Sequence, residues 1–324
     1  MRRREVIALL GSAAAWSFEA SAQQSGKEYR LGILTGQLRS DDQDTVAFLD
    51  ELRRSGFEEG RNLRVDYRGI HNPDQLKSAA AELAASRPDV LVSFGSLATV
   101  ALKATGTKLP IVFGQVGDPI AIGVVESLPR PGGNVTGVTN LLVDLAAKQI
   151  QLLHEVVPRA SKIGVVTQPG HPLDKAWHEQ YRVAAAKLGL NLVYLPVREP
   201  GDVPAMLDEA QTAKVEALIS SPLFPLWVRR REVINFSVHH RVPTLYNWMQ
   251  EAREGGLMSY GPDPLFHARR TANYVIKVLA GADPGTLPVE QPTKLLFILN
   301  LRTARTIGVE FPPTLLARAD EVIE

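Results

Sequence analysis

Short apolar runs alternate with amphipathic stretches along this chain, and this alternation limits its possible folds more than any other feature. Leu31-Gly32-Ile33-Leu34 has the length of one buried strand, and residues Asp44–Arg54 follow it with apolar side chains at helical spacing. Continuous apolar strands that alternate with helices predict parallel sheets covered on both faces. We predict further strands at Leu63–Tyr67, Asp89–Phe94, Pro110–Gly114 and Val135–Thr139, and helices at Leu76–Ser86 and Ser96–Ala104.

The same order of elements restarts in the second half of the chain. Ile163-Gly164-Val165-Val166-Thr167 repeats the form of Leu31-Gly32-Ile33-Leu34-Thr35. A repeated order predicts two similar, doubly wound α/β lobes rather than one long sheet. The elements that we assign to the second lobe are strands Asn191–Val197, Val215–Ser221 and Val242–Tyr246, and a helix at Leu173–Leu188.

The C-terminal part has too few elements for a third domain. It contains a strand at Leu257–Tyr260, a helix at Leu265–Ala280, and a last strand and helix at Leu296–Asn300 and Leu301–Gly308. Two lobes whose chain crosses back and forth would absorb these pieces, and several crossings make a hinge that allows closure around a ligand.

We therefore place crossings near Asn140–Asp144, Gly255–Leu257 and Thr293–Lys294. This assigns residues 29–140 and 257–292 to the first lobe, and residues 145–255 and 294–324 to the second.

The N-terminus has the order of an export signal. Arg2, Arg3 and Arg4 precede an apolar run from Val6 to Phe18, and Ala20-Ser21-Ala22 fits a cleavage site before Gln23. The run is shorter than the ~20 residues of a membrane-spanning helix. We expect residues 1–22 to be a signal peptide and the mature protein to be periplasmic. The adjacent arginines leave both the general secretory route and the twin-arginine route open.

Composition agrees with export and argues against nucleic acid as a partner. The chain has no Cys, and its 36 basic residues nearly balance its 35 acidic residues. A cysteine-free chain avoids mispairing in an oxidising compartment. Balanced charge gives no electrostatic footprint for nucleic acid. We expect a monomer that binds a small molecule and no nucleic acid.

Familiar catalytic and cofactor motifs are missing from the sequence. It has no G-x-G-x-x-G after a strand, no G-x-x-x-x-G-K-[ST] and no G-x-S-x-G. The one histidine pair, His239-His240, is a poor metal pair because neighbours on a helix point apart. The Arg229-Arg230-Arg231 run is typical of a solvated helix face. We expect no cofactor, no metal and no catalytic residue. The alternative is an α/β enzyme whose active site contains none of these motifs.

Polar residues that follow predicted strands are the candidate ligand contacts, because ligands of parallel α/β proteins lie outside the carboxyl ends of the strands. Ser96 and Thr99 begin a helix, where free N–H groups favour a carboxylate. Asp118 could pair with an ammonium group. Ser221 is the candidate in the second lobe, with Thr35, Thr167, Tyr246 and Asp263 as further contacts and Phe94, Phe224 or Tyr246 as aromatic walls.

Several stretches together carry a family resemblance. They are Arg2–Leu10, Gly56–Leu63, Gly117-Asp118-Pro119, Arg130–Gly137, Gly255–Gly261, Leu287–Lys294 and Pro312–Ile323. Across essentially its whole length the chain resembles the substrate-binding proteins of ABC transporters, the family with tryptophan- and tyrosine-binding members. The resemblance implies a type I periplasmic binding fold and the capture of a small molecule for an ABC permease. A ligand sensor that feeds a signalling partner is the alternative within this fold.

Overall fold

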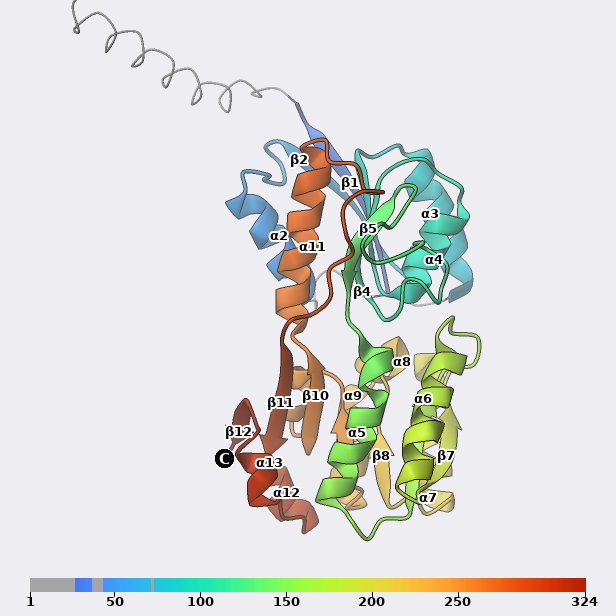
Figure 1. Cartoon of the computed structure of the whole chain (residues 1–324), viewed down its shortest axis with the longest axis vertical. Coiled ribbons are helices and arrows are strands. Elements are labelled where there is room, and N and C mark those ends of the chain that lie inside the picture. Colours follow the sequence, from blue (N-terminus) through green and yellow to red (C-terminus); the bar gives the residue numbers. More distant parts are fainter. Residues whose placement is uncertain (1–26, 37–42, 71–72) are drawn as a thin grey trace, which may run out of the picture.

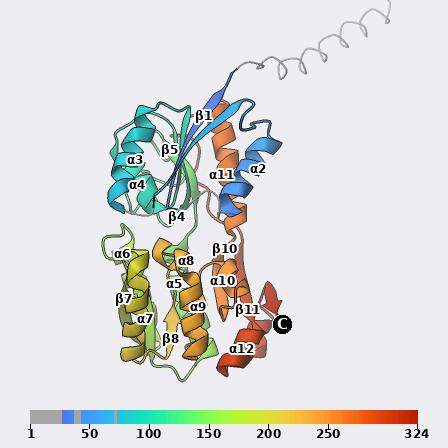
Figure 2. The same cartoon turned by 180° about the vertical axis from the view of Figure 1, so that it is seen from behind.

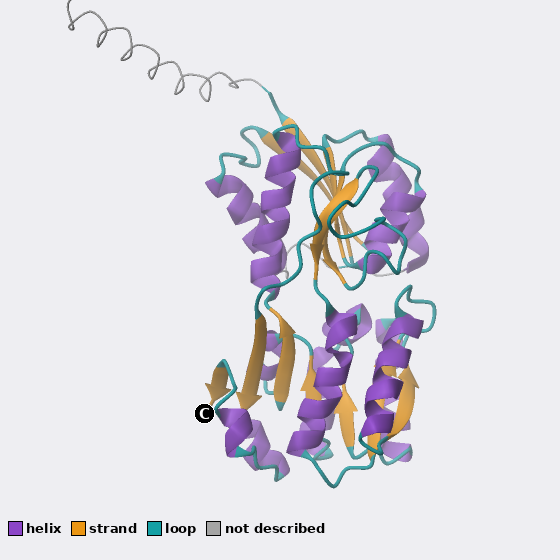
Figure 3. Cartoon of the chain, viewed as in Figure 1, coloured by secondary structure: helices purple, strands orange, loops and turns teal. Residues whose placement is uncertain are grey.

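A computed structural model describes residues 27–36, 43–70 and 73–324 as two α/β lobes, one above the other in Figure 1. The predicted signal peptide, residues 1–22, lies outside the described residues. Both lobes have a largely parallel sheet covered by helices on both faces, as Figure 3 shows by the helical layers on either side of the strands. The predicted fold class, two doubly wound lobes of the type I periplasmic binding fold, is therefore confirmed.

The described part of the first lobe has a parallel sheet in the order β2-β1-β3-β4-β5. Four of its strands match apolar runs that are almost wholly buried, whereas β2 is a partly exposed edge strand. They are β1 (Tyr29–Thr35), β2 (Leu63–Gly69), β3 (Val90–Phe94), β4 (Ile111–Val116) and β5 (Val135–Thr139).

Alternate side chains of these strands pack against different helices. Ile33 and Val92 belong to the core under α2 (Gln43–Arg54) and α11 (Pro264–Leu279). Leu34 and Leu91 belong to the core under α3 (Pro73–Ala85) and α4 (Ser96–Ala104). Successive strand side chains point to opposite faces, so each strand stabilises both layers.

The described part of the second lobe has a seven-stranded sheet in the order β12-β11-β10-β9-β8-β6-β7. Its strands are β6 (Lys162–Thr167), β7 (Asn191–Pro196), β8 (Ala217–Ile219), β9 (Thr244–Tyr246), β10 (Met258–Pro262), β11 (Leu295–Asn300) and β12 (Glu321–Ile323). All neighbouring strands are parallel except β10 and β11, which pair in antiparallel register.

Helices cover both faces of this second sheet. Helices α5 and α6 lie on the near face in Figure 1, and α7 and α9 lie on the near face in the reversed view of Figure 2. The helices are α5 (Leu142–Val156), α6 (Asp174–Lys187), α7 (Val203–Thr212), α8 (Phe224–Val228), α9 (Arg230–His239), α10 (Met249–Arg253), α12 (Leu301–Ile307) and α13 (Pro313–Leu316), with a short 3-10 turn, η3 (Pro200–Asp202).

The described chain passes between the lobes three times. The first passage joins β5 to α5, and the second joins β10 to α11. The third follows Glu290, which forms a bridge with Val138 of the first lobe, and ends where β11 begins at Leu295. A bidentate ion pair from Arg270 of α11 to Glu290 fixes the start of the third passage, at 2.6 and 2.5 Å.

The predicted crossing near Gly255–Leu257 is wrong. Leu257 is fully buried in the core of the second lobe, and β10 pairs with β9 and β11 of that lobe. The chain crosses after Pro262 instead, so residues 257–262 belong to the second lobe. The glycine turn before Leu257 ends α10 and is not a hinge.

One glycine in the first lobe is required by a close backbone approach. A Cβ built on Gly137 of β5 would lie 2.0 Å from the carbonyl oxygen of Phe113 in β4. Any other residue here would force the two strands apart beside the first passage. Separately, no helix among the described residues combines the length and apolarity that a bilayer crossing demands.

Candidate ligand-binding site

A cavity lies between the lobes, lined by residues that follow strands of both sheets. Its volume is about 210 Å³, whereas one water needs roughly 10–15 Å³, so it can hold a small organic molecule. Its polar lining residues are Thr35, Gln43, Asp44, Ser96, Gln115, Asn140, Gln168, His171, Arg198, Arg230 and Gln250. Its aromatic lining residues are Phe94, Trp177, Phe224, Trp227 and Trp248.

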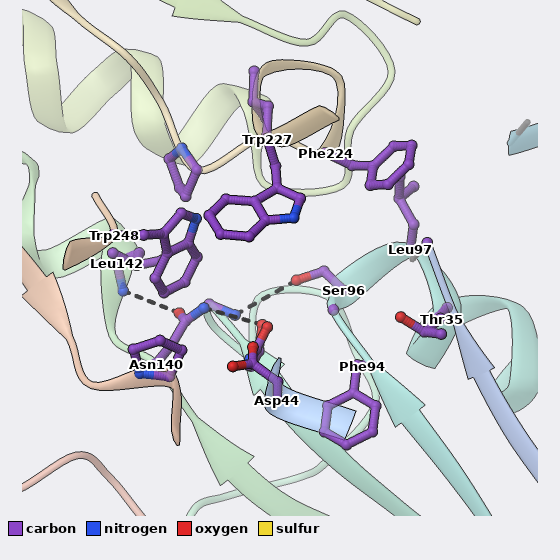
Figure 4. Close-up of a pocket in the computed structure, with 18 of the residues that line it drawn as sticks. Thr35, Asp44, Phe94, Ser96, Leu97, Asn140, Leu142, Phe224, Trp227 and Trp248 are labelled. Carbon is purple, nitrogen blue, oxygen red and sulfur yellow. Dashed lines mark hydrogen bonds between the residues drawn. The ribbon is translucent and has the colours of Figure 1, made fainter. Parts of the chain in front are cut away.

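Tryptophan rings from the second lobe form much of the apolar wall. Trp227 lies in α8 and Trp248 directly precedes α10, and Figure 4 shows both indole rings on the side of the cavity opposite Ser96 and Asp44. Arg230 lies 4.5 Å from the ring centroid of Trp227 and pairs with Glu254 through two contacts of 3.0 and 3.1 Å. These contacts hold the Trp227 ring in place.

Phe224 and Leu173 bring the lobes into contact at the cavity. A Cβ at Gly36 of the first lobe would lie 3.2 Å from the Phe224 ring, and a Cβ at Gly117 would lie 2.6 Å from Leu173 Cδ1. The absence of a side chain at these two positions allows the lobes to approach this closely.

The first lobe contributes a hydrogen-bonded group that reaches the hinge. Gln115 has a left-handed φ of 58°, at an irregularity in the pairing of β4 with β5. Its Nε2 donates to Asp44 Oδ2 at 2.7 Å, and its carbonyl oxygen accepts from Asn140 Nδ2 at 3.0 Å. A strained residue of this kind is common at ligand sites. The network in Figure 4 connects the cavity wall directly to the first passage between the lobes.

Ser96 stands at the start of α4, where the preceding Gly95 has a φ of 89°. That backbone conformation suits glycine, and it turns the chain from β3 into the helix. Ser96 Oγ accepts a weak hydrogen bond from Gly117 N at 3.5 Å. The first turn of α4 therefore borders the cavity.

The second lobe contributes a corner that is rich in hydrogen-bond donors. His171 stacks on Trp177 with ring centroids 4.8 Å apart, and its Nδ1 accepts from Leu173 N at 3.1 Å. Burial lowers the pKa of His171 to about 4, so the imidazole is neutral at pH 7. Gln168 donates to the carbonyl oxygen of Arg198 at 3.1 Å and so fixes the loop that carries Arg198.

Of the eight residues predicted as ligand contacts, Thr35 and Ser96 line the cavity. Thr99 lies outside the lining because it is on the fully buried side of α4, bonded to Ser93 and to the carbonyl of Gly95. Asp118 caps its own turn by accepting from Ile120 N and Ala121 N. The aspartate is therefore a turn residue in this structure.

The remaining four predicted contacts also lie outside the cavity lining. Ser221 donates to the carbonyl oxygen of Val166, and Asp263 caps α11. Thr167 is buried at the end of β6, and Tyr246 is fully buried in the core. All four follow or end strands as predicted, but local bonds or packing turn their side chains away from the space between the lobes.

Asp44, Gln115 and two tryptophans line the cavity but were not among the predicted contacts. Trp227 and Trp248 lie a few residues beyond the predicted strands Val215–Ser221 and Val242–Tyr246. The signal was therefore present, since both occupy the correct end of the sheet. The predicted aromatic walls Phe94 and Phe224 do line the cavity. The Arg229–Arg231 run is partly solvated as expected, although Arg230 is half-buried and borders the site.

Comparisons with known proteins agree with this geometry. A family model described as ABC transporter substrate binding protein matches residues 39–323. The tyrosine-binding protein of Clostridioides difficile (strain R20291) is 24% identical over 300 residues, which cover 91% of this chain and 85% of that protein.

Two solved structures share the fold over nearly the whole chain. A conserved domain protein from Vibrio cholerae is 28% identical with a TM-score of 0.85, covering 91% of this chain and all of that one. An ABC domain from Streptococcus pneumoniae, in complex with L-Trp, is 23% identical with a TM-score of 0.83, covering 92% of this chain and 100% of that one.

Two lobes joined by three passages around a lined cavity define a solute-binding protein. With the family model matching most of its length, the chain belongs to the ABC transporter substrate-binding protein family. It is a solute-binding protein and not an enzyme.

Proposed function

We propose that this protein captures a small aromatic compound of the amino-acid type between its lobes and delivers it to an ABC importer. It acts as a monomer outside the cytoplasmic membrane after cleavage near Ala22. The observation that carries the proposal is the lining of the interlobe cavity. Trp227, Trp248 and Phe224 provide an aromatic wall from one lobe, and polar groups face them from the other.

Two further observations support the ligand class. A ligand ring can stack on or abut the indoles at distances that favour aromatic pairs. Asp44 contributes a carboxylate to the first-lobe wall, which suits a ligand with an ammonium group. Tyrosine and L-Trp, which the names of two relatives print, combine an aromatic ring with an amino group.

The hinge gives the proposal its mechanism. A ligand shifts the lobes toward the closed arrangement only through contacts that it makes better in that arrangement. The contacts of Gly36 with Phe224 and of Gly117 with Leu173 exist only when the lobes are together. A ligand held against both walls would stabilise these contacts, and the closed form would then dock on the permease.

Calorimetry on the purified protein with L-tryptophan, L-tyrosine and L-phenylalanine tests the proposal. Trp248→Ala should weaken binding by about 10- to 100-fold, since a buried aromatic contact is among the strongest at a binding site. Tyr194→Ala is the matched control, because Tyr194 stacks on His178 and is not a lining residue. Failure of all three compounds to bind the wild-type protein would refute the ligand class. N-terminal sequencing of protein from its host tests the cleavage.

A further inference from the structure

The donor-rich corner of the second lobe has a composition that suits one kind of ligand group. It consists of His171, Trp177 and Arg198, with Gln168 behind them. The side chains of His171, Trp177 and Arg198 each present a hydrogen-bond donor and lack a free strong acceptor. An oxyanion is the complement of such a set.

His171 has a fixed tautomer. Its Nδ1 is occupied as the acceptor of the Leu173 N–H, so the proton of the neutral ring lies on Nε2. The stacking on Trp177 holds the plane of the imidazole. His171 can therefore give a ligand one neutral N–H donor in a defined direction.

Trp177 has an unsatisfied donor. The residue is only 7% exposed, and its indole Nε1 has no hydrogen-bond partner among the described residues. An indole N–H can only donate, and a buried donor without an acceptor costs about 1–3 kcal/mol. Trp177 is one of the residues that line the cavity, and its Nε1 is shielded from solvent. An acceptor that a ligand brought to Nε1 would remove this cost.

Arg198 adds a positive charge at the rim of the same corner. Within the described residues, no carboxylate lies within ion-pair distance of its guanidinium group. The nearby Asp202 carboxylate accepts from the backbone N–H groups of Arg198 and Glu199. Asp174, the acidic residue beside the corner, accepts from Gln168 N, lies near His178, and is not a lining residue.

We propose that His171, Trp177 and Arg198 form an oxyanion subsite of the cavity, which takes a carboxylate group of the ligand. Gln168 is a positioning residue, because it holds the carbonyl of Arg198. The proposal rests on the proposed function for the identity of the whole ligand. It adds an orientation: the carboxylate binds the second lobe, and the ammonium group binds the first lobe beside Asp44.

The test uses sodium acetate as the probe and the indole N–H signals of a ¹⁵N-tryptophan-labelled protein as the readout. Trp177→Phe assigns the signal of Trp177. Acetate should move that signal downfield in a saturable titration. Arg198→Gln should weaken acetate binding by about tenfold, since it removes a charge-assisted contact. Arg231→Gln is the matched control, because its side chain is 82% exposed and outside the lining.

A second arm compares L-tryptophan with tryptamine, which has the ring and the ammonium group but no carboxylate. Tryptamine should bind at least about tenfold more weakly, and Arg198→Gln should weaken L-tryptophan alone. An unmoved Trp177 signal, or an equal acetate titration in Arg198→Gln, overturns the subsite even where L-tryptophan binds. If acetate titrates as expected but no aromatic compound binds, the proposed function falls and the subsite stands.

Discussion

A buried carboxyl group beneath the cavity wall should give this protein an unusual dependence of stability on pH. Glu251 of α10 is 3% exposed, and it accepts from the backbone N–H of Trp248 at 3.1 Å. Burial raises the pKa of Glu251 to about 8, because the Trp248 bond and the charge of Arg230 only partly offset the lost hydration. In the unfolded chain the same group has an ordinary pKa of 4.5.

Whether stability rises or falls with pH depends on which state, folded or unfolded, holds the Glu251 proton. Between pH 4.5 and about 8 the folded protein keeps the Glu251 proton and the unfolded chain has lost it, so unfolding is favoured as pH rises. The two buried histidines His171 and His267 act oppositely, since burial lowers each pKa to about 4. About 0.4 kcal/mol of each histidine's contribution to the free energy of unfolding still accrues above pH 6.5, where half of the unfolded chains carry the proton.

From pH 6.5 to 8 the Glu251 effect should therefore exceed that of the histidines. One proton contributes about 1.36 kcal/mol per pH unit, and less as the pH approaches the folded pKa, so Glu251 lowers the free energy of unfolding by about 1.6 kcal/mol over this range and the two histidines together raise it by about 0.8 kcal/mol. Glu251→Gln keeps an acceptor for Trp248 N and cannot titrate, so its stability should rise slightly there whereas that of the wild type falls. Glu209→Gln on the exposed face of α7 is the control.

Urea unfolding at pH 6.5, 7.25 and 8 measures the effect, followed by tryptophan fluorescence. A slope that is unchanged in Glu251→Gln would refute the reasoning, because the loss of stability would then come from another group. The binding affinity of Glu251→Gln should stay close to that of the wild type, since Glu251 bonds to backbone N–H groups of Asn247 and Trp248 and is not a lining residue.

Three other substitutions have clear expected results. Gly137→Ala should destabilise the first lobe, because the new Cβ would meet the Phe113 carbonyl. Urea unfolding should show a loss of several kcal/mol, on the order of the larger single-site effects. Wild-type stability would contradict this contact. Lys214→Gly should raise the thermal midpoint and increase the free energy of unfolding by about 0.5–1 kcal/mol, because Lys214 has a left-handed φ of 53°. A lowered midpoint would show that no strain is stored there. Arg270→Gln removes the ion pair with Glu290, so it should lower the free energy of unfolding by about 1 kcal/mol and increase proteolysis of the third passage. An unchanged digestion pattern would show that the pair does not restrain the passage.

The sequence predicted the fold well where apolar runs were long enough to be buried on both faces. β1 and β6 are examples, and the helices that follow them were found from their spacing. The crossing before β10 was misplaced, because a glycine pair marks a helix end and a hinge in the same way. The pairing of Met258 with Leu245 of β9 and with Leu299 of β11 decides between them, and such pairing leaves no local mark in the sequence.

The site was harder to predict than the fold. The correct sheet edge followed from parallel topology, and this rule found Thr35 and Ser96. It could not tell which side chains at that edge would form hydrogen bonds within their own turn, as Asp118 does. It also missed Asp44, which enters the cavity from a helix N-terminus and is tied to Gln115, a residue far away in sequence.

The late return of the chain to the first lobe has a consequence for the order of folding. Helix α11 packs against α2 and completes the core of the first lobe, although more than a hundred residues of the other lobe intervene. The edge of β10 likewise remains open until β11 arrives. A chain growing from its N-terminus therefore has no lobe that can finish early. Both halves become complete almost together, when the last sixty or so residues are available.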